Sequence, residues 1–240
     1  MNVRPAAVYP IALARLWIDR LRNAHTHHHA IARGMAWVMF FVLLGSAARA
    51  AREMAIAYPN GVSGAVDPYL FVFNLVSWPI AVWFSVLSIV LVPLASDFKE
   101  HESARLSLFR AELLGLTLLF GMSLAIVSWT GLPLLLRSSL AALPANTAEI
   151  AINMIPMLTL LLPIGLIISL FSAWMLVAAR HLNTLLEGVP ALVLVMALLL
   201  YPSSGWEPLV WGTIGGFVCH LTVLAVPLWK RDEIASPLFT

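Results

Sequence analysis

The stretch GMAWVMFFVLLGSAARAAREMAIAY, Gly34 to Tyr58, is apolar except for three charged residues in its second half. The apolar run before Arg49 is too short for a bilayer core of about 30 Å, which needs about 20 helical residues. A crossing helix must therefore continue through Arg49, Arg52 and Glu53, or begin earlier, near Ala30. The choice decides whether charges lie at membrane depth.

Arg49 and Arg52 are three residues apart and share one helix face, and Glu53 is placed four residues after Arg49 for an ion pair. Charged side chains within a membrane helix usually face a protein interior or a watery cavity on a substrate path. The alternative is that both arginines extend to the outer interface. The bias of positive residues towards the cytoplasm favours the cavity, because two outward arginines without a purpose are unexpected.

The rest of the chain has the same membrane character. Hydrophobic residues make up 61% of its 240 residues and charged residues 11%, against about 25% charged in a soluble domain. This composition excludes a soluble enzyme, a disordered chain and a nucleic-acid module, and predicts an all-α, multi-pass helix bundle. Six apolar runs are candidate spans: about Gly34–Tyr58, Pro68–Ser96, Leu106–Leu136, Thr147–Ala179, Glu187–Tyr201 and Glu207–Trp229.

Basic residues predict the orientation. They gather in the tail of residues 1–33 and in the turns after the second and fourth spans, and Lys230 and Arg231 follow the sixth. The positive-inside rule then places both termini in the cytoplasm. We expect a cytoplasmic tail at 1–33, a six-span domain at 34–231 and a short cytoplasmic tail at 232–240. Within the first tail, about Ile11–Leu21 is either an interfacial helix or solvated.

Polar residues mark the second span. Asp67 at its start and Asn74 seven residues later share a helix face. Both are candidate substrate contacts, although most such residues form hydrogen bonds between helices. Asp67 is alternatively a loop residue or an N-cap. Pro79, farther along, should kink the helix.

Later spans contain helix breakers and packing motifs. Asn153, Pro156 and Pro163 predict that the fourth span is broken or kinked. Gly212 and Gly216 form a GxxxG pair that permits close helix packing. We interpret His220, on the same span, as a hydrogen-bonded packing residue, with a role as a ligand as the alternative.

Few features indicate enzyme chemistry. The single cysteine, Cys219, excludes an internal disulfide and a cysteine-built metal site. The cluster His25 and His27–His29 lacks a neighbouring carboxylate or cysteine, so we expect no metal site there. There is no nucleotide, zinc-protease or nucleophile-elbow motif. The sequence predicts neither an enzyme nor a cofactor.

One segment resembles a known family. GSAARAAREMAIAYPNGVSGAVDPYLFVFNLVSWPIAVWFSVLSIVLVPLASD, Gly45 to Asp97, resembles the first two helices of the MurJ/MviN lipid II flippases, in the multidrug/oligosaccharidyl-lipid/polysaccharide exporter superfamily. The matching positions are Arg52-Glu53, Gly61, Asp67 with Tyr69, and Val92-Pro93. Weaker similarity continues in order to residue 231, through Pro190 at the start of the fifth span and the glycines of the sixth.

This resemblance implies a function in peptidoglycan biosynthesis or polysaccharide export. A bacterial inner-membrane flippase would translocate a polyprenyl-pyrophosphate-linked saccharide such as lipid II. Arg49 and Arg52 would contact the pyrophosphate, and Asp67 would orient an arginine or a helix terminus, with Glu53 and Asn74 beside them. The family has two six-helix lobes, so this chain would supply one, completed by a second copy or a separate lobe.

The chain also departs from the family pattern. Only Arg52 falls on a family cavity arginine, and the basic pair of the family's second helix falls on apolar or small residues around Ile80, Ala81 and Ser85. The alternative function is therefore a non-transporting scaffold or assembly subunit of a polysaccharide synthesis or export complex. Its partner would be a glycosyltransferase, whereas a transporter would bind membrane lipid and a lipid-linked saccharide.

Overall fold

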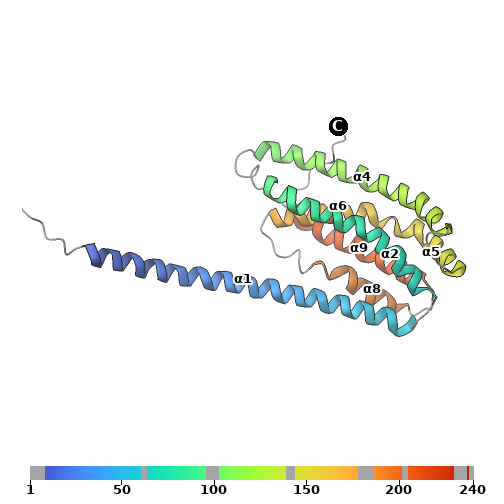
Figure 1. Ribbon diagram of the computed structural model, residues 1–240, viewed down its shortest axis with the longest axis horizontal. Coiled ribbons are helices and arrows are strands. Elements are labelled where there is room, and N and C mark those ends of the chain that lie inside the picture. The colour runs from blue at the N-terminus through green and yellow to red at the C-terminus, as the bar shows by residue number, and fades with distance from the viewer. Residues whose placement is uncertain are drawn as a thin grey trace, which may run out of the picture. The chain divides into compact units, whose positions relative to one another are not determined.

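The computed structural model describes residues 9–60, 64–95, 103–138, 144–177, 186–201, 205–229 and 237, with side chains omitted at 9–32, 59–60, 103–105 and 229. Residues Met1–Leu43 and Leu44–Thr240 are two compact units, and each is described by itself. All regular structure in the described ranges is helical, which confirms the all-α prediction. The elements are α1 (Tyr9–Asn60), α2 (Val66–Val86), η1 (Leu87–Leu91), α4 (Ser103–Arg137), α5 (Ala145–Leu158), α6 (Leu161–Val177), α8 (Val189–Leu200) and α9 (Glu207–Trp229), as drawn in Figure 1.

Helix α1 both begins before Ala30 and continues through Arg49, Arg52 and Glu53, so its backbone is compatible with either of the two sequence alternatives. Its backbone is also helical over Ile11–Leu21. The placement of that segment on a membrane surface stays a prediction, since its side chains lie outside the described set. The same holds for the histidine cluster at residues 25–29.

Four helical segments are long and apolar enough to cross a membrane: Arg33–Tyr58, Val66–Ala95, Leu106–Arg137 and Glu207–Leu228. The pair α5 and α6 makes a fifth if both helices form one span. The predicted fifth run is only the 12-residue helix α8, about 18 Å long and shorter than the bilayer core. The described residues thus support four or five crossings. Because five crossings would put the ends on opposite sides, the cytoplasmic location of both termini stays a prediction.

The predicted break in the fourth run is present. Helices α5 and α6 meet at an angle of 50° across Thr159 and Leu160. A proline ring inside a helix clashes with the carbonyl four residues earlier, and for Pro163 that residue is Thr159. Pro156 lies inside α5, which continues past it to Leu158. Pro163 therefore explains the position of the break.

Helix α2 is followed without interruption by the wide π-helical turn η1. The expected disturbance at Pro79 does not end α2. Two serine hydroxyls bond back to carbonyls of the preceding turn: Ser85 to Ala81 at 3.0 Å and Ser88 to Phe84 at 2.8 Å. Such bonds compete with the regular helical ladder, and the irregular turn begins beside them.

Helices α8 and α9 form the most extensive helix contact of the second unit and lie side by side in Figure 1. Glycines make this approach possible. A Cβ atom on Gly216 would lie 2.8 Å from the Pro190 carbonyl oxygen, and one on Gly212 would lie 2.6 Å from the Leu194 side chain. The GxxxG prediction is thereby confirmed, with α8 as the partner helix.

The second unit has two clusters of buried apolar side chains. The first contains side chains of α2, α5, α8, α9 and the start of α6, with one residue each from α1 and α4, around residues such as Tyr69, Met154 and Leu209. The second joins η1, α4, α6 and the later part of α9 around residues such as Leu91, Phe171 and Leu224. Many large apolar side chains point outward instead, including Ile126, Val127, Trp129, Leu199 and Leu200. An apolar exterior of this extent fits a lipid environment.

Candidate functional site

Arg52 contacts both the next helix and a neighbouring carboxylate. Its guanidinium lies 5.6 Å from the centre of the Phe73 ring on α2. Its Nε and Nη2 atoms donate to one carboxylate oxygen of Glu53, the former at 3.1 Å. The side chain is 23% exposed. Glu53 thus pairs with its neighbour Arg52, and the predicted pair with Arg49 is absent. Arg49 instead donates to the Ser46 hydroxyl at 3.1 Å.

The ring beneath Arg52 is held by a buried network. Phe73 stacks on Tyr69 at 5.8 Å between ring centres, and Tyr69 is 1% exposed. The Tyr69 hydroxyl lies 2.6 Å from the Thr213 hydroxyl on α9. Thr213 donates its only hydroxyl proton to the Leu209 carbonyl at 2.7 Å, so Tyr69 is the donor to Thr213. The network links α1, α2 and α9 and fixes the surface on which Arg52 rests.

Tyr69→Phe should destabilise the protein by about 1 kcal/mol, the typical worth of one buried hydrogen bond. Thr213→Val should cost more, because the buried Tyr69 hydroxyl then loses its acceptor. The double variant should be less destabilised than the sum of the two single variants. Thermal unfolding in mild detergent measures all three. Additive effects would show that the two hydroxyls do not stabilise one another.

Arg49 acts on a different carboxylate. Partial burial raises the pKa of the Glu187 carboxyl, and the positive charge of Arg49 opposes that rise. Glu187 begins the fifth predicted run but lies in the turn before α8, outside the helices that are long enough to cross a membrane, and it is exposed. Arg49, Arg52, Glu53 and Glu187, two positive and two negative residues, are here called the charged rim.

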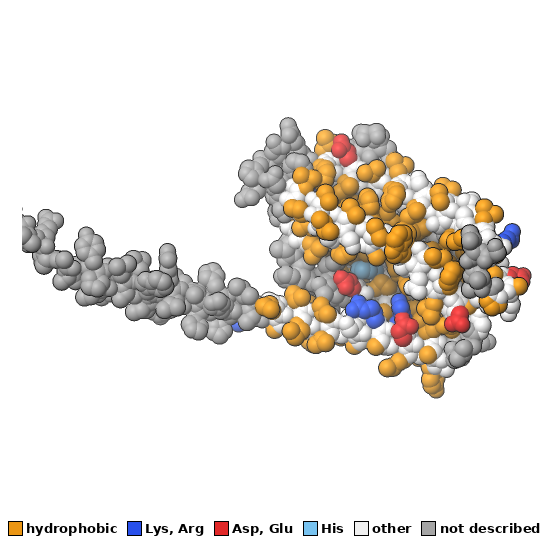
Figure 2. Space-filling model, in the orientation of Figure 1, with side chains coloured by type: hydrophobic (Ala, Val, Ile, Leu, Met, Phe, Trp, Pro, Cys, Tyr) orange, Lys and Arg blue, Asp and Glu red, His pale blue; other side chains and the backbone are white. Residues whose placement is uncertain are grey.

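Glu187 also lines a cavity of about 250 Å³, here called the His220 cavity. Figure 2 shows charged side chains beside a hollow on this face, with histidine inside it. The walls come from α2, α6 and α9 and are mostly apolar. The lining residues are Ser77, Ile80, Ala81, Phe84, Ile168, Ser169, Ser172, Glu187, Phe217 and His220.

Two of the lining residues each have a buried polar atom without a partner among the described residues. His220 Nε2 and Ser77 Oγ are buried, and neither has a hydrogen-bond partner among the described residues. The His220 side chain is 6% exposed. For Nε2, the sequence interpretation of a hydrogen-bonded packing residue is therefore wrong. Ser169, by contrast, donates to the Gly165 carbonyl at 2.9 Å.

Asp67 and Asn74 do not join the charged rim. Both are exposed on α2, which fits their predicted common face. Asp67 lies within the first turn of α2, whose N-cap residue is Ala65, so Asp67 is neither a loop residue nor the N-cap. Within the described part of the chain, neither residue forms a hydrogen bond or an ion pair with Arg49 or Arg52. Of the five predicted site residues, the structure thus groups Arg49, Arg52 and Glu53.

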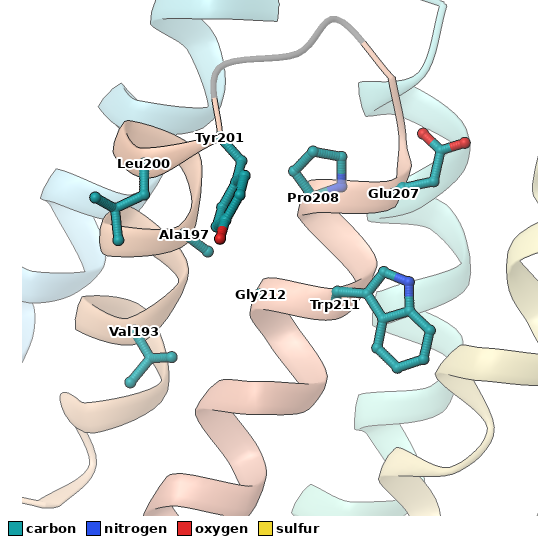
Figure 3. Close-up of a pocket in the computed structure, with 8 residues that line it drawn as sticks. All are labelled: Val193, Ala197, Leu200, Tyr201, Glu207, Pro208, Trp211 and Gly212. Carbon is teal, nitrogen blue, oxygen red and sulfur yellow. The ribbon is translucent and has the colours of Figure 1, made fainter.

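A larger cavity, of about 680 Å³, lies where α8 and α9 meet at the 201–207 connection. In Figure 3, Tyr201 and Pro208 stand on opposite sides of its open end, near Glu207. It shares no lining residue with the His220 cavity, and it contains no basic side chain. Its apolar walls and single carboxylate make it unsuited to an anionic ligand.

The sequence analysis did not select Glu187 or Ser77 as site residues, and it gave a role as a ligand for His220 only as the alternative. Glu187 was visible only as the polar start of an apolar run. Ser77 was one of several hydroxyls on its helix. Only the tertiary structure reveals these residues together, because they surround one cavity only once α2, α6 and α9 have packed.

The described residues contain no group of three or more His, Cys, Asp or Glu side chains that could hold a metal ion. No protein-family model matches the chain, and no curated protein is significantly similar to it.

Proposed function

We propose that this chain is a flippase-like protein of the bacterial inner membrane that binds the pyrophosphate of a polyprenyl-linked saccharide. The observation that carries the proposal is the pair Arg49 and Arg52 on one face of a candidate span. Guanidinium groups match phosphate oxygens in geometry and charge. The resemblance of Gly45–Asp97 to lipid II flippases supports the same substrate class, with both termini cytoplasmic and α8 contributing to a sixth crossing.

Arg52 is the more constrained of the two arginines. It rests on Phe73 and shares its donors with Glu53. A phosphate would compete with Glu53 for the same N–H groups, so binding and displacement of the carboxylate would be coupled. Among the described residues, Arg49 has only a neutral hydroxyl as its hydrogen-bond partner, which leaves donors available for a second phosphate oxygen.

A second function is favoured by the charge balance. The two arginines of the charged rim are offset by Glu53 and Glu187, so the rim has no net positive charge. A rim without excess charge attracts an anion weakly. This balance, together with the apolar side chains Ile80 and Ala81 on α2, supports a scaffold in a polysaccharide synthesis or export complex. Such a scaffold would contact a glycosyltransferase.

Binding and translocation assays separate these functions. The chain in nanodiscs would be titrated with a fluorescent polyprenyl-pyrophosphate saccharide, and translocation would be followed in proteoliposomes by quenching from outside. We expect Arg52→Gln to weaken binding about tenfold or more, since a hydrogen bond to a charged group is worth roughly 1.5–3 kcal/mol. Glu53→Gln should strengthen binding by removing the competing carboxylate.

Arg137→Gln, at the exposed end of α4, is the matched control and should bind as the unaltered chain does. Equal binding by Arg52→Gln and the unaltered chain would refute the assignment of the pyrophosphate site. Binding without translocation by the single chain would fit one lobe of a larger transporter, because alternating access needs two moving halves. Capture of a glycosyltransferase with no effect of Arg52→Gln would favour the scaffold.

A further inference from the structure

The His220 cavity has a chemistry different from that of the charged rim. Its walls are apolar side chains such as Ile80, Phe84 and Phe217, and the polar lining atoms come mainly from hydroxyls and one imidazole. Among the described residues, no lysine or arginine lines it. A phosphate inside would leave water without gaining a cationic partner, and it would be repelled by Glu187 at the edge. The cavity therefore selects against anions.

Its polar groups nevertheless require a partner. His220 Nε2 and Ser77 Oγ are both buried and unpartnered among the described residues. Buried polar groups are almost always hydrogen-bonded, because burial removes their hydrogen bonds to water and a group without a partner gains none in return. An imidazole in this apolar surrounding is favoured in its neutral form, which can donate or accept at Nε2. A serine hydroxyl can do the same. The partner they fit is a neutral group that both donates and accepts.

A hydroxyl is the smallest group with both properties. The remainder of the ligand must match apolar walls, so an alkyl or prenyl chain suits it better than a polyhydroxylated body. Gly165 contributes to the shape of the wall, because its missing side chain leaves room for Ile80; an added Cβ would lie 2.3 Å from the Ile80 side chain. Such ligands partition into membranes and would reach the cavity from lipid.

We propose that the His220 cavity binds an uncharged amphiphile, a long-chain or prenyl alcohol, whose hydroxyl bonds to His220 and Ser77. This inference does not depend on pyrophosphate binding at the charged rim. The two sites take different chemical groups, an anion at the rim and a neutral hydroxyl inside.

Photolabelling tests the proposal. The full chain in nanodiscs would be irradiated with a hexadecanol that carries an aliphatic diazirine, and labelled peptides would be located by mass spectrometry. We expect labelling on α2 and α9 near Ser77 and His220. Unlabelled hexadecanol should compete, whereas hexadecane and hexadecyl phosphate should compete at least about tenfold less well.

Ser77→Ala should reduce cavity labelling about threefold to tenfold, the effect of one lost hydrogen bond. Ser85→Ala is the matched control on the same helix, because its hydroxyl already bonds to the Ala81 carbonyl. His220→Phe should abolish the labelling by filling the space, and Ser77→Ala keeps the test valid if that larger change disturbs folding. Labelling unaffected by Ser77→Ala, or equal competition by hexadecane, would overturn the proposal. So would labelling confined to lipid-facing residues.

Discussion

Gly216→Ala should lower the melting temperature of the protein by about 5 °C, and Gly216→Leu should prevent native packing of α8 against α9. A Cβ atom at this position would lie 2.8 Å from the Pro190 carbonyl oxygen and 2.9 Å from Pro190 Cα. Backbone atoms cannot turn aside as a flexible side chain can. Overpacking of this kind costs about 1–3 kcal/mol, and a leucine adds further atoms to the clash. A protein of this size loses roughly 2–4 °C per kcal/mol.

The neighbouring Gly215 supplies the control. A Cβ atom there would meet only Val193, at the ordinary contact distance of 3.9 Å. Gly215→Ala should be neutral or slightly stabilising, because alanine favours the helix by about 1 kcal/mol over glycine. Thermal unfolding in mild detergent, followed by tryptophan fluorescence, measures both variants. If Gly216→Ala and Gly215→Ala melted together, the close approach of α9 to Pro190 would be wrong.

Gly121→Leu should disrupt the packing of α4 against α6, with a loss of at least about 3 kcal/mol in the free energy of unfolding. A Cβ atom on Gly121 would lie 2.8 Å from Pro163 Cα and 3.3 Å from its Cβ. Pro163 is rigid and stands next to the break between α5 and α6, so the neighbouring backbone has little freedom to move away. We expect aggregation or early elution in size-exclusion chromatography, with an earlier unfolding transition.

Gly131, ten residues later on the same helix, is the matched position, because no atom lies within 4 Å of a Cβ built there. Gly131→Leu should therefore fold and elute as the unaltered chain does. A normal elution profile for Gly121→Leu would contradict the close contact between Gly121 and Pro163. Equal loss in both variants would instead point to an effect of leucine on α4 itself.

The sequence predicted those features that depend on neighbours along the chain. Apolar runs predicted the long helices, since each must satisfy its own backbone hydrogen bonds in lipid. Asn153, Pro156 and Pro163 together predicted a broken or kinked fourth run, and Gly212 with Gly216 predicted a close helix approach. The short α8 was harder to judge, because an apolar run shows where a helix lies more reliably than whether it crosses the bilayer.

The site was predictable only in part. The helical repeat grouped Arg49, Arg52 and Glu53 correctly, yet it paired Glu53 with Arg49. Glu53 pairs with Arg52 instead, and Arg52 also contacts Phe73, which lies on another helix. The His220 cavity depends on three helices and the turn before α8. Its residues are far apart in sequence and individually ordinary, so no local pattern could reveal them.

The wide turn η1 bears on how this sequence is compared with others. Leu87, Leu91 and Ala95 are all buried, and each step of four residues turns a regular helix only about 40° past a full turn, so the three lie on one face. The π-helical turn accommodates the additional residue locally. Alignment with a protein whose second helix is regular therefore needs a one-residue gap within Leu87–Leu91. A comparison at constant offset would match Asp67 correctly and displace Val92-Pro93 by one position.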